Sequence, residues 1–325
     1  MSGILIVMKK VGILRGGISD QYDFSLETGA EVARAVQDAG FEAIDMLLDK
    51  DGLLHIKGIP ADLEKVHSSV DTVWNALHGE FGEDGKVQEL FENFGIPYTG
   101  AGRLASGIGF NKEIAKEHVA ELGIKTPTHI LIVPDGSESV SDITRRIYTK
   151  IAPPWVIKPL VGGASAHTYF AFTTLDLAQI VEDSVSHAVP FIAEQYIFGK
   201  EVAVGVMDDF RSTAPYALPP IEIQSPSRGV LTRDMRKQNE YIEERDTLTQ
   251  SEKELLTDMA KKIHTHIGAK DYSQVEFILD KYGAPWFVEI DTHPHLHEKA
   301  PFREALNRVG AKLSDVVASI INKKE

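Results

Sequence analysis

Three carboxylate residues, Glu276, Glu289 and Asp291, lie in or directly after two apolar runs of a segment near the C-terminus, residues 272–294. Two apolar runs flank a Lys-Tyr-Gly turn in this segment, which is the pattern of a β-hairpin. Glu289 and Asp291 are two residues apart and would share one face of a strand, where Glu276 on the paired strand can join them. Buried carboxylates need a neutralising cation, and such oxygen ligands suit Mg²⁺, especially when phosphate oxygens complete its coordination. The alternative is an ordinary hairpin whose polar face lies in solvent.

A second candidate is a lysine at the end of a predicted strand, residues 155–158. Lys158 is followed by a loop that contains Gly and Ser, residues 159–165. A lysine beside such a loop suits phosphate binding, because the ammonium group supplies a point charge and the loop supplies backbone amides. The alternative is a surface loop between two strands.

A third candidate residue is His78. The part of the chain around it is predicted to alternate between strands and helices. Strands are predicted at residues 11–14, 41–48 and 71–77, and helices at residues 25–39 and 86–94. This alternation predicts a parallel α/β sheet, whose ligands bind at the carboxyl ends of the strands. His78 follows one such end, although it could equally be a turn residue.

The second half of the chain mixes regular elements with less regular segments. Strands are expected at residues 129–133, 155–158, 168–172, 191–196 and 216–223, and helices at residues 112–122, 141–150, 251–267 and within 302–321. We expect residues 197–206 to form a polar link between two strands, with Glu201 able to bind a ribose. Residues 224–249 show little periodicity and are expected to form a lid or a disordered excursion. Ser251 and Glu254 have the spacing of a capping box.

The composition is that of a soluble globular protein, with 325 residues, 43% of them hydrophobic and 25% charged. No run of 18 apolar residues exists and the apolar stretch at residues 4–7 is too short for a signal peptide, so we expect a cytoplasmic protein. The absence of cysteine excludes disulfides, thiolate metal sites and a cysteine nucleophile. A net charge of −14 argues against nucleic acid or an anionic membrane as the main partner.

The order of these motifs resembles that of the D-alanine–D-alanine ligases of the ATP-grasp superfamily, over nearly the whole chain. The most specific match is ALHGEFGEDGKVQELFENFGIPYTGAG, at residues 76–102. Further matches are GFNKEIAKEHVAELGIKTP from residue 109, WVIKP ending at residue 159, and AEQYIFGKEVAVGV from residue 193. The resemblance implies an α/β fold, α+β in its C-terminal half, in which an N-terminal parallel-sheet domain precedes an ATP-grasp fold. The implied domains are residues 1–107, 108–196 and 197–325.

The resemblance also implies which residues bind the cofactors, ATP and two Mg²⁺ ions. The implied nucleotide-binding residues are Lys112, Lys158, Glu194, Gln195, Ile197 and Glu201. The lysines would contact phosphates, residues 194–197 would form the adenine hinge, and Glu201 would bind the ribose. Glu276, Glu289 and Asp291 would hold the metal ions, with Glu and Asp at positions where the family usually has Asp and Asn.

The predicted catalytic positions, in the amino-acid half of the site, are His78, Ser165, Gln274 and His295. In this half the chain departs from the family pattern. Gln21 stands where a glutamate holds the first substrate's ammonium group, and Gln274 stands where an arginine neutralises the oxyanion. His295 replaces a glycine that donates its N–H to the oxyanion, and Ala164 and Ala300 replace two serines. Loss of one oxyanion donor typically costs about 3 kcal/mol of transition-state stabilisation.

Three hypotheses about function follow. The first is an ATP-dependent carboxylate–amine ligase that forms an amide bond through an acyl phosphate, with altered substrates. The second is a D-alanine–D-alanine ligase of peptidoglycan biosynthesis with a rebuilt pocket, in which Arg233, Arg236 or Lys299 replaces the missing arginine. The third is a catalytically impaired ATP-binding homologue with a regulatory or binding role. Retention of the nucleotide and metal positions favours a ligase.

Three histidines, His293, His295 and His297, alternate directly after the hairpin. On an extended chain they would share a face and could bind a transition metal. The alternative, which we prefer, is that they line the substrate pocket. The expected partners are small amino-acid or related substrates, and the resemblance implies a homodimer formed through the N-terminal domain.

Overall fold

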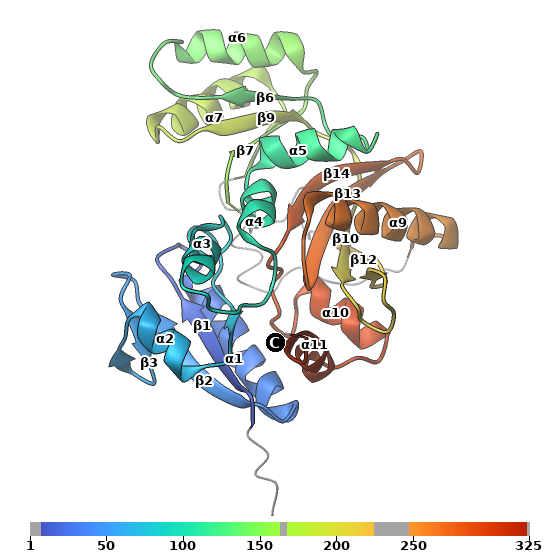
Figure 1. Cartoon of the computed structure of the whole chain (residues 1–325). Coiled ribbons are helices and arrows are strands. Elements are labelled where there is room, and N and C mark those ends of the chain that lie inside the picture. Colours follow the sequence, from blue (N-terminus) through green and yellow to red (C-terminus); the bar gives the residue numbers. More distant parts are fainter. Residues whose placement is uncertain (1–7, 163–167, 224–246, 324–325) are drawn as a thin grey trace, which may run out of the picture.

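Three β-sheets with flanking helices make up the described part of the computed structural model, which comprises residues 8–162, 168–223 and 247–323. Figure 1 shows the first sheet in blue, the second in green to yellow and the third largely in orange. The two C-terminal sheets are antiparallel throughout, whereas the first has a parallel centre. The predicted change from α/β to α+β along the chain is therefore confirmed.

The N-terminal sheet has the strand order β4-β3-β2-β1-β5. Its strands are β1 (Lys10–Gly16), β2 (Glu42–Leu48), β3 (Leu54–Ile56), β4 (Ile59–Pro60) and β5 (Thr72–Asn75). Its helices are α1 (Tyr22–Asp38), α2 (Leu63–Ser69) and α3 (Lys86–Asn93). β1 is parallel to β2 and β5, as predicted, whereas β3 and β4 are antiparallel additions that sequence analysis did not predict.

The carboxyl ends of β1 and β5 are tied together by one buried hydroxyl. β1 ends at Gly16, where a φ of 93° and the nearby carbonyl of Leu48 leave no room for a side chain. The Gly16 N–H donates to Ser25 Oγ over 2.8 Å, and Ser25 Oγ donates to the carbonyl of Ala76 over 2.7 Å. These bonds hold the start of α1 against the segment that leads to His78.

The central part of the chain contains a second sheet of order β6-β9-β7-β8. Its strands are β6 (His129–Ile132), β7 (Trp155–Pro159), β8 (Tyr169–Ala171) and β9 (Phe191–Gln195). Helices α4 (Arg103–Phe110) and α5 (Lys112–Glu121) precede it, and α6 (Val140–Lys150) and α7 (Thr174–Ser186) pack on it around one apolar core. Sequence analysis did not predict α4 or α7.

The third sheet has the order β11-β10-β13-β14, and β12 also pairs with β10. Its strands are β10 (Gly199–Met207), β11 (Tyr216–Ala217), β12 (Ile221–Ile223), β13 (Tyr272–Asp280) and β14 (Pro285–Asp291). Helices α9 (Gln250–Ile267), α10 (Pro301–Arg308) and α11 (Leu313–Ile321) complete this part. The predicted hairpin is β13–β14.

Two expectations for this sheet were wrong. The expected polar link at residues 197–206 is largely strand β10, which pairs with β13 along its whole length and is buried from Val202 onward. The single strand expected at residues 216–223 is two short strands, β11 and β12. Pro219 and Pro220 separate them, because proline has no N–H to donate to a sheet.

The start of α9 also differs from expectation. The helix is capped by Thr249, not by Ser251. The N–H of Glu252 donates to Thr249 Oγ1, and the N–H of Thr249 donates to Glu252 Oε2 over 2.7 Å, which is a reciprocal capping box. Leu248 is buried one residue earlier, so packing places the helix start two residues before the predicted cap.

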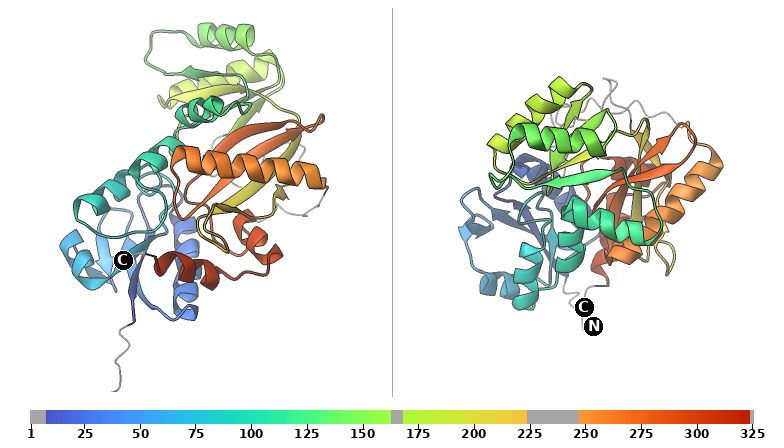
Figure 2. Two further views of the ribbon diagram at one scale, coloured as in Figure 1. Left: turned by 45° about the vertical axis from the view of Figure 1, so that its right-hand side comes forward. Right: turned by 90° about the horizontal axis from the view of Figure 1, so that it is seen from above.

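The last helix, α11, packs against the first helix, α1. Residues of α11 such as Val317 and Ile320 share one buried core with Val32 and Val36 of α1. Both views of Figure 2, like Figure 1, show α11 near the blue N-terminal elements. The predicted division after residue 107 lies within α4, and that after residue 196 lies between β9 and β10. Among the described residues there is no helix long and apolar enough to cross a membrane.

Candidate active site

A cavity of about 1170 Å³ is lined by residues from all three sheet regions. The predicted nucleotide- and metal-binding residues that line it are Lys112, Lys158, Glu194, Gln195, Ile197, Glu201, Glu276 and Glu289. His78, Gln274, Asp291 and His295 are not among its lining residues. All four are close to it. His78 directly precedes Gly79, which lines the cavity, and the His295 ring lies beside that of His78. Gln274 donates a hydrogen bond to Glu276, which also lines the cavity, and pairs across the strands with Asp291.

Two buried lysines hold one buried carboxylate at the edge of this cavity. Lys116 Nζ lies 3.0 Å from Glu194 Oε1, and Lys158 Nζ lies 2.9 Å from Glu194 Oε2. Burial alone would raise the pKa of Glu194, but the charges of Lys116 and Lys158 outweigh it and lower the pKa to about 2. Glu194 therefore remains ionised and orients Lys158 on β7 toward the cavity.

Sequence analysis missed Lys116, although a signal for it exists. Lys116 follows Lys112 by four residues on α5, so the two side chains share one helix face. Lys112 also donates from Nζ to the carbonyl of Gly162, and burial lowers its pKa. One face of α5 thus supplies two amines to the site.

A pair of carboxylates lies on the adjacent strands β13 and β14. Glu276 is the direct cross-strand partner of Glu289, and the strand register shifts immediately after Glu276. Both residues line the same cavity as Lys112 and Lys158. Lysines facing paired oxygen donors fit a polyphosphate with bound Mg²⁺, because each group then meets its opposite charge.

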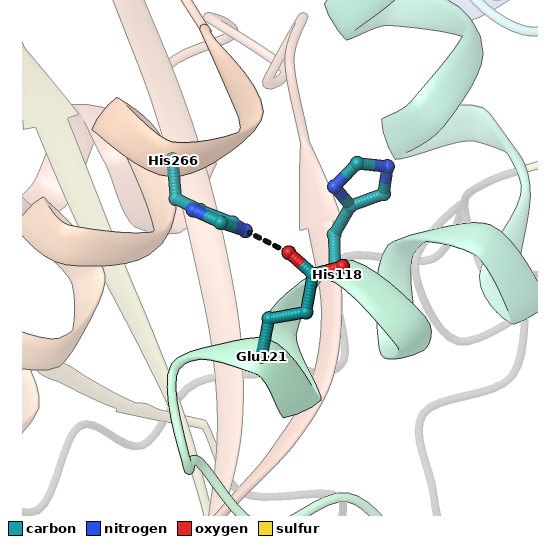
Figure 3. Close-up of side chains that lie close together, drawn as sticks. All are labelled: His118, Glu121 and His266. Atoms are coloured by element: carbon teal, nitrogen blue, oxygen red, sulfur yellow. Dashed lines mark ion pairs between the residues drawn. The ribbon is translucent and has the colours of Figure 1, made fainter.

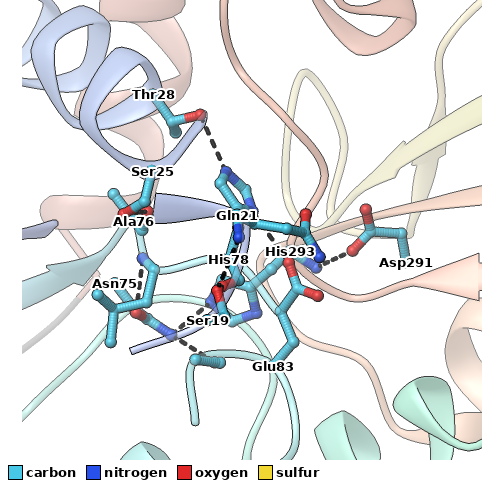
Figure 4. A network of polar contacts seen from close by, with 12 residues as sticks. Ser19, Gln21, Ser25, Thr28, Asn75, Ala76, His78, Glu83, Asp291 and His293 are labelled. Carbon is cyan, nitrogen blue, oxygen red and sulfur yellow. Dashed lines mark hydrogen bonds and ion pairs between the residues drawn. The ribbon is translucent and has the colours of Figure 1, made fainter. Parts of the chain in front are cut away.

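Behind the cavity lies the buried polar network shown in Figure 4. His78 Nδ1 is 2.9 Å from Glu83 Oε1, and His78 Nε2 is 2.9 Å from Thr28 Oγ1. Burial lowers the pKa of His78 to about 4 and raises that of Glu83 to about 8. At neutral pH these shifts favour an uncharged imidazole beside a protonated Glu83 carboxyl. Sequence analysis did not single out Glu83, which lies five residues after His78.

Asp291 lies in this network and not on the cavity wall. Its Oδ1 accepts the backbone N–H of His293 over 2.7 Å. Burial, reinforced by the charge of Glu83, raises the pKa of Asp291 to about 8. Asp291 pairs across the strands with Gln274, whose Nε2 donates to Glu276 Oε1 over 3.2 Å. Gln274 therefore links the network to the carboxylates of the cavity.

The three histidines after the hairpin do not bring their ligand atoms together in one cluster. His293 Nε2 is 3.1 Å from Asn75 Nδ2, and its ring lies against Tyr272. The His295 ring lies 4.1 Å from that of His78, between centroids, and His297 is 5.8 Å further along. This arrangement gives no support to a metal site shared by the three histidines, and none of the three lines the cavity.

The other positions at which the chain departs from the family pattern are buried near α1 and α10 or lie outside the described residues. Gln21 is buried at the start of α1, where its N–H donates to Ser19 Oγ over 3.2 Å. Ala300 is buried just before α10. Ser165, Ala164, Arg233 and Arg236 lie outside the described residues, as does most of the segment 224–249.

A cavity between antiparallel sheets, with lysines opposite carboxylates, is the arrangement expected of the ATP-grasp fold. Two solved structures share the fold. They are "D-alanyl-alanine synthetase A" from Vibrio cholerae, with a TM-score of 0.82, 21% identity and 98% of each chain covered, and a D-alanine–D-alanine ligase from Bacillus anthracis complexed with ATP, with a TM-score of 0.78, 24% identity and 97% of each chain covered. The predicted ATP-grasp fold is confirmed.

Sequence comparisons identify the family. Residues 54–101 match the model "D-ala D-ala ligase N-terminus" and residues 119–322 match "D-ala D-ala ligase C-terminus". The D-alanine–D-alanine ligases of Aquifex aeolicus and Pelotomaculum thermopropionicum are 29% and 28% identical to this chain, covering 96% of it and 99% and 95% of their own lengths. The chain belongs to the D-alanine–D-alanine ligase family, and the predictions of family and of ligase activity are confirmed.

Proposed function

We propose that this chain joins the carboxylate of one small amino acid to the amine of a second at the expense of ATP, with D-alanine as the leading candidate for both. The observation that carries the proposal is the facing arrangement of Lys112 and Lys158 with Glu276 and Glu289 around one cavity. Family membership supports the same activity, and with it a role in peptidoglycan biosynthesis. The comparisons give no support to the impaired homologue over this ligase.

In this proposal ATP supplies the phosphoryl group that activates the first carboxylate. Lys112 and Lys158 neutralise its phosphates, while Glu194 holds Lys158 in place. Gln195, the last residue of β9, and Ile197 provide the adenine hinge, and Glu201 near the start of β10 binds the ribose. Glu276 and Glu289 on the cavity wall, together with Asp291 next to it, would hold two Mg²⁺ ions, because carboxylate oxygen atoms suit this metal.

The amino acids would bind where the cavity meets the buried network. Ser19 Oγ donates to the carbonyl of His78, so the loop after β1 and the segment after β5 form one wall. His78, Gln274 and His295 adjoin the cavity and would contact the reacting carboxylate, as would Ser165. Gln274 offers an uncharged amide donor, so we expect slower turnover of D-alanine than an arginine would allow.

The test is a coupled assay of ADP and phosphate release with a panel of D- and L-amino acids and hydroxy acids, followed by mass spectrometry of the product. Formation of D-alanyl-D-alanine supports the proposal. Turnover with another pair supports the altered-substrate hypothesis, and nucleotide binding without turnover on any pair favours the impaired homologue. Absence of Mg-ATP binding by calorimetry overturns all three.

We also propose that the chain is cytoplasmic, that it divides into domains at residues 1–107, 108–196 and 197–325, and that it forms a homodimer through the first of them. The separate sheets support the division, although α11 packs back on α1. Light scattering of the purified chain would reveal the dimer. A monomer at all concentrations used in the assay would contradict it.

A further inference from the structure

Three metal-ligating side chains meet on the surface where α5 and α9 end. They are His118 and Glu121 of α5 and His266 of α9, and one ligand atom from each lies within 4.8 Å of the other two. His266 Nε2 is 3.2 Å from Glu121 Oε2, and the His118 and His266 ring centroids are 5.8 Å apart. Figure 3 shows the Glu121 carboxylate between the two helices, on the side of α5 that faces His266.

This cluster is separate from the proposed ATP site. Lys112, Lys116 and Val119 are on the buried face of α5. His118 follows Lys116 by two residues, which is a rotation of about 200° around the helix axis, so its side chain leaves the helix on a different side from that of Lys116. None of the three clustered residues lines the cavity. Neither ATP nor its magnesium ions would explain why these side chains converge.

We propose that His118, Glu121 and His266 form a binding site for a divalent transition-metal ion of the Zn²⁺ type. Two imidazoles and a carboxylate are suitable ligands for Zn²⁺, Ni²⁺, Co²⁺ or Cu²⁺, whereas Mg²⁺ prefers an all-oxygen site. Water would complete the coordination, since Glu121 and His266 are both solvent-accessible.

The geometry needs only small adjustments to hold such an ion. Ligand atoms about 2.0–2.1 Å from a tetrahedral Zn²⁺ lie roughly 3.3 Å from one another. The separation of His266 Nε2 from Glu121 Oε2 already matches this value. The remaining separations, at most 4.8 Å, can shorten by side-chain rotation because the cluster is at the surface.

The surrounding electrostatics also favour a cation at this point. α5 ends at Glu121 and α9 ends at Ile267, so two helix C-termini, each with partial negative charge, meet at the cluster. The net charge of the whole chain is −14, which attracts cations in general. The competing explanation is a surface ion pair between His266 and Glu121, which requires no metal.

A bound ion would join two helices that already share a core. Ala115 and Val119 of α5 pack in the same apolar cluster as Ala260 and Ile263 of α9. The metal would therefore stabilise an existing interface, and the melting temperature of the protein should rise with the logarithm of the free Zn²⁺ concentration once that exceeds the Kd.

The test is a calorimetric titration of the untagged full chain with Zn²⁺. Mg²⁺ is present in excess so that it, and not Zn²⁺, binds the carboxylates of the cavity. We expect one Zn²⁺ per chain and an increase in melting temperature. Loss of even an outer-sphere partner often weakens metal binding 10–100-fold, so the double variant His118→Ala/His266→Ala should lose at least about tenfold in affinity. His67→Ala, which removes an exposed histidine from α2, should bind Zn²⁺ as the wild type does.

Two further measurements separate this site from the cavity. Glu289→Gln should retain Zn²⁺ binding in excess Mg²⁺, because Glu289 lies outside the cluster. Electron paramagnetic resonance of Cu²⁺ bound to the wild type should show coupling to imidazole nitrogen, and the double variant should lose it. An absence of saturable Zn²⁺ binding in the wild type, or equal affinity in the double variant, would overturn the proposal whether or not the ligase activity is found.

Discussion

Glu276 on β13 lies directly opposite Glu289 on β14, and both carboxylates line the cavity that Lys112 and Lys158 share. Like charges directly opposite on neighbouring strands destabilise a sheet, and a divalent cation between them reverses that effect. This relationship links the stability of the hairpin to the proposed magnesium ions.

Glu289→Gln should therefore have different effects with and without metal. Without metal, the free energy of unfolding should rise, by up to about 1 kcal/mol, only if the lost repulsion by Glu276 outweighs the lost attraction to Lys112 and Lys158. With Mg²⁺ and ATP, we expect nucleotide affinity to fall by about tenfold or more, because a charged ligand is lost. Denaturant titration and calorimetry measure the two effects. Glu182→Gln, on the exposed surface of α7, serves as the control, and equal behaviour of the two variants would contradict the magnesium proposal.

Glu194→Gln should destabilise the protein strongly. It leaves the buried ammonium groups of Lys116 and Lys158 without their carboxylate, and loss of one partner of a buried pair typically costs about 3–5 kcal/mol. The further change Lys116→Met should recover part of the loss, because one of the two uncompensated charges is then removed. Urea unfolding of the single and double variants measures the recovery. A single variant as stable as the wild type would show that the carboxylate is not needed to hold the lysines.

The low pKa of Glu194 also predicts an acid-dependent loss of stability. The folded-state pKa of about 2 lies below the ordinary glutamate pKa of 4.5, so the unfolded chain binds the proton first as the pH falls. The stabilisation from ionised Glu194 is complete above pH 4.5 and disappears as the pH falls from there toward 2. Urea titrations across this range should give a smaller pH dependence for Glu194→Gln than for the wild type. Parallel curves would assign the acid sensitivity to other carboxylates.

Glu83→Gln should alter stability at the alkaline side of neutrality. Burial raises the folded-state pKa of Glu83 to about 8, so the folded protein keeps a proton that the unfolded chain releases near pH 4.5. The wild type should therefore lose stability as the pH rises toward 8. Glutamine resembles the protonated form and removes this contribution. Thermal unfolding without metal, between pH 6.5 and 8.5, should show a shallower decline for the variant.

Gln274→Arg should increase turnover of D-alanine. The side chain at 274 lies between Asp291, its cross-strand partner, and Glu276, so a guanidinium there would face the developing negative charge. We expect D-alanine-dependent phosphate release to rise by roughly tenfold or more. Adding Gln21→Glu and His295→Gly should raise it more than additively, since the three act on one substrate complex. A triple variant that folds and binds ATP like the wild type, yet shows no dependence on D-alanine, would show that these positions alone do not limit the activity.

Local sequence patterns predicted most regular elements and much of the candidate site. The β13–β14 hairpin follows from two apolar runs around a turn, and α5 follows from helical periodicity that ends at Gly123. The motifs at residues 76–102 and 193–206 were specific enough to indicate the family, which the comparisons then confirmed. The patterns failed at β10, because a strand that is buried on both faces does not alternate between apolar and polar residues. They also failed at the N-terminal cap of α9.

The sequence by itself determined which residues could bind phosphate and metal, because residue type and motif order carry that information. Only the tertiary structure decided which charges are neighbours. Lys116 and Glu83 became part of the site through contacts with Glu194 and His78. Likewise, His118 and His266 are far apart in the chain and meet only because α5 and α9 pack side by side. Burial and non-local packing set these distances and pKa values, and neither is a property of a short stretch of sequence.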